Sequence, residues 1–162
     1  MKRSQQLLAV AGLALAVWAM AYGFYYAVWI EHQTLDHIGG SLAGAFQHAA
    51  LREAAASHAS LADCARAKYV YTREVDAHSH WMGLAMILMV LAALWNRLAF
   101  GEGARGALAG VLIFGAYGFP LGVLLQNYVG HGIGQGIAVV ASGLLIVALG
   151  AVALGFARER AS

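Results

Sequence analysis

This sequence of 162 residues predicts an all-α fold, an integral membrane bundle of four spanning helices. Hydrophobic residues make up 61% of the chain and charged residues only 11%, whereas a soluble domain carries about 25% charged residues. Four apolar stretches reach, or can extend to, the roughly 20 residues that a helix needs to cross the hydrocarbon core. We therefore expect one membrane domain over residues 1–162.

The first span is expected at about residues 7–30, because the stretch from Leu7 to Ile30 contains no charge. It is too long and too aromatic for a cleavable signal segment, whose apolar part has about 7–15 residues. The other spans are expected at about 77–100, 106–128 and 131–157. The third contains Pro120, which removes one backbone hydrogen bond and predicts a kink.

A long polar segment, residues 31–76, separates the first two spans and is predicted to be helical and periplasmic. Small and apolar residues predict one short helix over residues 43–56. Ser60, followed three residues later by Asp63, is typical of the start of a second helix. Two short helices that cap the bundle are therefore expected.

Lysine and arginine predict the orientation, because they gather on the cytoplasmic side of a membrane protein. The residues near the chain ends and in the connection between spans two and three include Lys2, Arg3, Arg97, Arg105, Arg158 and Arg160. The sequence predicts a multi-pass protein of a bacterial inner (cytoplasmic) membrane, in contact with membrane lipid and with both termini cytoplasmic. A net charge of +2 from scattered basic residues indicates no nucleic-acid partner.

Three of the seven histidines, His78, His80 and His131, are placed at the outer ends of spans. Ionisable groups inside a membrane are costly and tend to mark function. His131 lies among alternating glycines, and Gly132 and Gly136 are one turn apart on a helix. Such a bare face would accept a flat macrocycle such as heme, whose commonest protein ligand is imidazole. The same glycines would equally serve close helix packing.

His78 and His80 are about 200° apart on a helix, so only one of them can face a given ligand. His78 begins a stripe that continues with Met82, Met86 and Met89, and histidine with methionine suits Cu(I). Methionines at this spacing are also typical gap-filling core residues. The second hypothesis is a copper or zinc site held by His78, His80 and His131, with help from the outer-segment histidines and Met82, in a protein that handles metal or is an enzyme subunit. A structural subunit without cofactor is the third.

The run Asp76-Ala-His-Ser-His-Trp-Met-Gly-Leu-Ala-Met-Ile-Leu-Met is followed by an apolar helix that ends in an arginine. It resembles the His-Ala-His-Leu-Asn-Leu-Leu-Gly pattern of small four-helix bacterial membrane proteins similar to subunit one of heme-copper oxidases and nitric oxide reductases. The resemblance covers mainly residues 76–97. Trp81 and Met82 replace the usual Leu-Asn, and the long outer segment is not part of the pattern.

This resemblance implies that His80, the second histidine of the pattern, ligates a low-spin heme near the outer face. The trans ligand would come from a later helix, where His131 is the available histidine. The leading hypothesis is therefore a membrane b-type heme protein that transfers electrons, with quinol or as a small subunit of a respiratory-type redox complex. Whether it is an enzyme stays open, since no catalytic residue is indicated. The glycine-rich faces allow homo-oligomers as well as packing within one chain.

Overall fold

Each apolar stretch forms an α-helix, the structure that satisfies backbone polar groups where water is absent. The computed structural model describes residues 2–129 and 131–159, with only the backbone of His131 and Glu159. Within that part of the chain no strand occurs. The helices are α1 (Arg3–Tyr25), α2 (Glu31–Ala50), α3 (Ala54–Leu94), α4 (Glu102–Leu125) and α5 (His131–Glu159).

Four helical segments of the described chain are long and apolar enough to cross a membrane. They are Arg3–Ala50, Ala54–Arg97, Glu102–Leu125 and Gly132–Arg158. The predicted all-α membrane fold with four spanning helices is therefore confirmed. α4 is continuous through Pro120, which is fully buried.

The first two spans belong to helices much longer than predicted. α1 passes through a π-helical turn, η1 (Tyr26–Ile30), directly into α2. α3 runs without interruption from Ala54 to Leu94, so Ser60 lies inside a helix and the predicted helix start at Ser60 is wrong. The alanine-rich residues just before it favour helix strongly, so the serine has no free helix end to cap.

The predicted helix over residues 43–56 is also wrong, because the chain turns at residues 51–53. The Glu53 N–H donates to the His48 carbonyl at 2.9 Å and the Arg52 N–H to the Ala49 carbonyl at 3.0 Å. This pair of bonds is a Schellman motif, which ends a helix with one left-handed residue. Arg52 takes that conformation, with φ 61°, where glycine is usual and would have been the sequence signal.

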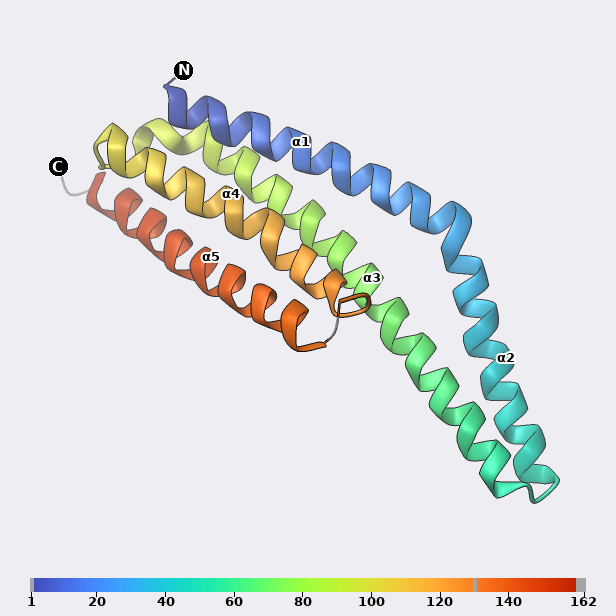
Figure 1. Cartoon of the computed structure of the whole chain (residues 1–162). Helices are drawn as coiled ribbons and strands as arrows, with labels where there is room; N and C mark the ends of the chain where they lie inside the picture. The colour runs from blue at the N-terminus through green and yellow to red at the C-terminus, as the bar shows by residue number, and fades with distance from the viewer. Residues whose placement is uncertain (1, 130, 160–162) are drawn as a thin grey trace. The chain divides into compact units, whose positions relative to one another are not determined.

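The chain divides into two units, which are described separately. We call Met1–Met20 with Asp76–Ser162 the bundle, and Ala21–Val75 the hairpin. In the bundle, α4 and α5 and the adjoining parts of α1 and α3 run side by side, and the start of α1 and the end of α5 lie at the same end of it (Figure 1). In the hairpin, α2 lies antiparallel to the first part of α3 (Figure 1).

Small residues bring α4 and α5 into close contact. A Cβ atom on Gly122 would lie 2.5 Å from the Ala138 backbone nitrogen, and one on Gly134 would lie 2.5 Å from that of Gln126. Gly115 similarly receives the side chain of Leu145. Helices in lipid associate through such close packing rather than through a hydrophobic driving force.

Polar side chains join α1, α4 and the end of α3 with the 3-10 turn η2 (Trp95–Arg97) that follows it. We call this group, at the end of the bundle where α1 begins, the polar knot. The Trp95 indole N–H donates to Ser4 Oγ at 3.1 Å, and Ser4 Oγ donates to Glu102 Oε1 at 2.7 Å. Gln5 donates to the Ala92 carbonyl at 2.9 Å. Trp95 is fully buried, and Ser4 and Gln5 are nearly so. These bonds fix the register of the three helices.

We predict that Gly122→Ala destabilises the bundle by about 1–3 kcal/mol, the usual cost of forcing an extra methyl group into a packed core. The added Cβ would meet backbone, which cannot move aside cheaply. The matched control is Gly143→Ala on α5, where a Cβ meets nothing within 4 Å and alanine favours helix. Unfolding of both variants in detergent measures the difference; equal stabilities would contradict the close α4–α5 contact.

Candidate functional site

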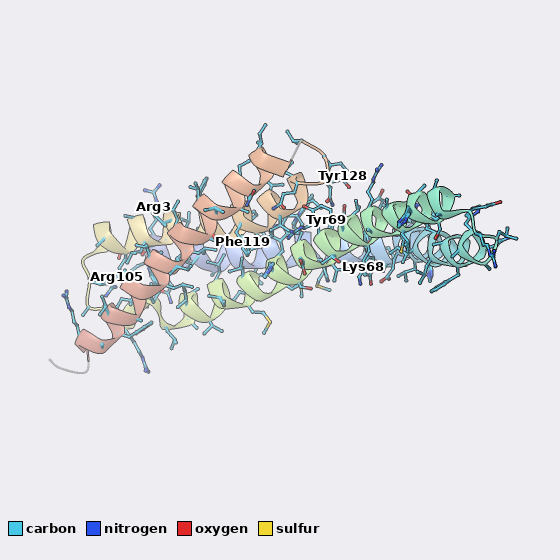
Figure 2. The ribbon with its side chains drawn as sticks, turned by 90° about the horizontal axis from the view of Figure 1, so that it is seen from below. Arg3, Lys68, Tyr69, Arg105, Phe119 and Tyr128 are labelled. Atoms are coloured by element: carbon cyan, nitrogen blue, oxygen red, sulfur yellow. The ribbon has the colours of Figure 1, made fainter. Side chains whose placement is uncertain are left out.

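His78 and His80, the histidines of α3 that belong to the bundle, have different surroundings. The His80 ring lies beside Phe119 of α4, with ring centroids 4.8 Å apart. Phe119 lies toward the end of α4, away from Arg3 and Arg105 (Figure 2). It is six residues before Leu125, the end of α4, a distance of roughly 9 Å along the helix. His80 therefore lies beside the second half of α4.

His80 is exposed, and within the described chain neither of its ring nitrogens has a hydrogen-bond partner. A neutral imidazole carries one donor and one acceptor. The protein satisfies neither of them within the described chain. The arrangement is that of a side chain available to a ligand.

His78 is half-buried and already engaged. Its Nδ1–H donates to the backbone carbonyl of Ala19 on α1 at 3.0 Å. A hydrogen bond of this kind fixes the tautomer and leaves Nε2 as an acceptor, as in most metal-ligating histidines. His78 and His80 thus face different neighbours, as their spacing predicts.

The methionine stripe after His78 does not share one environment. Met89 packs against α1, where a Cβ on Gly12 would lie 3.0 Å from its Cγ. Met86 is 60% exposed, and Met82 is half-buried. The position of Met89 is that of a gap-filling core residue. In the described part of the chain, no group of three or more His, Cys, Asp or Glu residues is placed to hold a metal ion.

The glycines near the start of α5 divide between two faces. Gly134 is buried against α4, whereas Gly132 and Gly136 are exposed and a Cβ on either would meet nothing within 4 Å. Helix packing therefore accounts for Gly134 alone. The bare face of Gly132 and Gly136 is free to receive a ligand, a lipid or another chain. The side chain of His131 lies outside the described residues.

The register of α4 and α5 places the backbone of His131 relative to His80. Gly118 packs against Ala141 and Gly122 against Ala138, so Phe119 is level with about residue 140 of α5. His131 is about nine residues further along α5, which is roughly 14 Å at 1.5 Å per residue. The backbones of the two predicted ligands therefore lie at different depths.

The hairpin contains a separate polar cluster that the sequence did not single out. His37 Nε2 lies 3.0 Å from Asp63 Oδ2, and Ser41 Oγ donates to the same oxygen at 3.2 Å. Because the hydroxyl contacts the carboxylate and not the imidazole, the three residues do not form a nucleophilic triad. Both members of the ion pair are about half exposed, and such pairs contribute little stability.

Tyrosine side chains in the hairpin donate hydrogen bonds to its acidic residues. Tyr22 donates to the buried carboxylate of Glu74, and Tyr71 donates to Glu31 at 3.4 Å. Tyr26 stacks on Tyr22, with ring centroids 6.5 Å apart. Glu74 therefore serves the hairpin as a hydrogen-bond acceptor for tyrosine.

Comparison with models of protein families, with curated protein sequences and with solved structures returns no match to this chain.

We predict that His78→Ala and His80→Ala differ in their effect on the fold of the protein without bound cofactor. His78→Ala loses a hydrogen bond to α1 and is expected to lower stability by about 1 kcal/mol. His80→Ala removes an exposed ring and is expected to change stability by less than about 0.5 kcal/mol. Thermal unfolding in detergent compares them. A larger loss for His80→Ala would show that its ring is mainly a packing element.

Proposed function

We propose that the protein is a membrane b-type heme protein, with one heme near the periplasmic face, and that it acts in electron transfer or as a small subunit of a respiratory-type redox complex. The observation that carries the proposal is His80, an exposed imidazole on a helix long and apolar enough to span a membrane, whose ring nitrogens have no partner in the described chain. Metal coordination would compensate the cost of placing this polar group in lipid.

The small number of ligands available favours heme over a bare metal ion. Structural zinc sites use four protein ligands and catalytic ones three. Heme iron takes four nitrogens from its porphyrin and needs only one or two from the protein. The isolated position of His80 is therefore better suited to heme, although His78, His131 and Met82 define the alternative copper or zinc site.

The neighbours of His80 would hold the ligand in place. The Trp81 indole N–H donates to the Tyr117 carbonyl at 3.4 Å, and the Tyr117 hydroxyl donates to the Ala11 carbonyl at 3.0 Å. These bonds tie α3 to α4 and α4 to α1 at residues that are one position from His80 and two from Phe119 in the chain. When bound, a heme supplies one-electron chemistry, and its potential depends on the axial ligands and on burial.

His131 is the proposed second ligand of the iron. Its backbone lies at a different level along the bundle from that of His80. His80 and His131 would both have to reach the same iron, whereas their backbones are offset by roughly 14 Å of helix. Binding through both would require α5 to begin nearer to α3 when the cofactor is present. With His80 alone, the iron would keep an open position for a small ligand such as O₂ or NO.

We also propose that the bundle lies in a bacterial inner membrane with both termini cytoplasmic. In the bundle, α1 and α4 begin, and α3 and α5 end, at the polar-knot end. Arg3, Arg97, Arg105 and Arg158 belong to these helix ends, and such a gathering favours the cytoplasmic side.

The heme proposal predicts a coloured protein. The full chain, purified in detergent from a heme-replete host, is expected to show a Soret band that shifts on dithionite reduction, with iron in stoichiometric amount. His80→Ala is expected to abolish the band. His131→Ala is expected to convert the spectrum to that of a five-coordinate heme. His58→Ala, an exposed hairpin residue, serves as the matched control and should change nothing.

Other outcomes decide against the heme. A colourless sample with stoichiometric copper or zinc would support the metal site instead, and a sample with neither colour nor metal would support a cofactor-free subunit. An unchanged spectrum in either ligand variant would remove that histidine from the coordination of iron.

The orientation predicts the reactivity of Cys64, the single cysteine, which lies in the hairpin and is partly exposed. A membrane-impermeant maleimide added to spheroplasts is expected to label it. In a Cys64→Ser chain, Gly101→Cys in the connection between α3 and α4 is the control and should react only after lysis. Labelling of Gly101→Cys in intact spheroplasts, with protection of Cys64, would reverse the topology.

A further inference from the structure

A groove of about 490 Å³ lies between α1 and α4, in a part of the bundle that the heme proposal does not use. Its polar lining is Arg3 and Gln6. Its apolar lining includes Leu7, Val10 and Gly110. Because these residues belong to the first turns of α1 and to the first half of α4, the groove begins at the polar-knot end and extends into the spanning part.

Two glycines of α4 leave this groove open. Gly106 and Gly110 are one turn apart, and a Cβ on either would meet nothing within 4 Å. Gly106 lines an adjoining cavity of about 320 Å³, which also includes Arg3. On the same helix, Gly115 and Gly122 are filled by α5. Helix packing within the described chain therefore explains Gly115 and Gly122, but it does not explain Gly106 and Gly110.

The charge at the mouth of the groove is not neutralised by the protein. Arg3 is exposed and forms no ion pair within the described chain. Glu102, an acid that lines the adjoining cavity, accepts two hydrogen bonds from Ser4, from its N–H at 3.3 Å and its hydroxyl at 2.7 Å, and it forms no ion pair with Arg3. A cation at one end and an apolar floor along the rest match an amphiphile with an anionic head.

We propose that this groove binds an anionic phospholipid, with its phosphate at Arg3 and Gln6 and one acyl chain along Leu7, Val10 and Gly110. Basic pockets between spanning helices are a common form of lipid-headgroup site. The volume falls within the roughly 300–1,000 Å³ of typical ligand sites. Figure 2 shows Arg3 toward the same end of the bundle as Arg105, far from Phe119, so the lipid site is separate from His80.

The test compares two lipids that differ only in their headgroup. Delipidated full-length protein in detergent is titrated with phosphatidylglycerol or phosphatidylcholine of identical acyl chains, and bound lipid is counted by native mass spectrometry. Phosphatidylglycerol is expected to bind at least fivefold more tightly, since one basic residue contributes about 1 kcal/mol. Arg3→Gln is expected to remove that preference. Gly110→Leu, which fills the floor, is expected to weaken both lipids.

Two matched controls distinguish specific lipid binding in the groove from nonspecific electrostatic attraction of anionic lipid to the protein. Arg158→Gln removes an exposed arginine from the same end of the bundle, on α5, and should keep the preference. Gly150→Leu adds a side chain at an open position of α5 and should bind both lipids normally. Equal binding of the two lipids by the natural chain would overturn the proposal. Equal losses in Arg3→Gln and Arg158→Gln would do so as well.

Discussion

The register of α1, α3 and α4 is the constraint on which the rest of the bundle depends, and the polar knot sets it. In lipid, the hydrophobic effect does not specify how one helix slides along another, so packing and hydrogen bonds must do so. The bonds among Ser4, Trp95 and Glu102 connect three helices at once. A shift by one residue would move a side chain by 1.5 Å and turn it by 100°. That register brings the His78 ring to the Ala19 carbonyl and the His80 ring to Phe119.

Glycine is used in two physically different ways along the bundle. Gly122 and Gly134 let the backbones of α4 and α5 approach, and neither position has room for a Cβ. Gly106 and Gly110 instead leave a hollow beside α1. The first use stabilises the protein through its own contacts. The second leaves apolar surface that a membrane component can cover, and it lies beside an arginine without an ion-pair partner in the described chain.

The histidines are likewise divided by their surroundings rather than by their chemistry. In the hairpin, His37 pairs with Asp63 and His48 with Glu53, and all four side chains are substantially exposed to solvent. In the bundle, His78 bonds a backbone carbonyl, whereas the His80 ring lies tilted beside that of Phe119 and has no hydrogen-bond partner among the described residues. The last arrangement leaves an exposed imidazole, without a hydrogen-bond partner among the described residues, on a helix long and apolar enough to span a membrane, and it therefore carries the functional proposal.

By itself, the sequence determined the fold class, the number of spans and the helical nature of residues 31–76, because hydropathy and length decide whether a helix can cross a membrane. The limits of α4 and α5 lie within a few residues of those predicted. The continuity of α1 into α2, and of α3 through Ser60, required the tertiary structure, since local capping signals act only where a helix end exists. Which glycines pack and which stay open, and which histidine is satisfied, depends on helix register. Register arises from contacts between residues far apart in the chain, such as Ser4 with Glu102 and Gly122 with Ala138, and no local pattern encodes it.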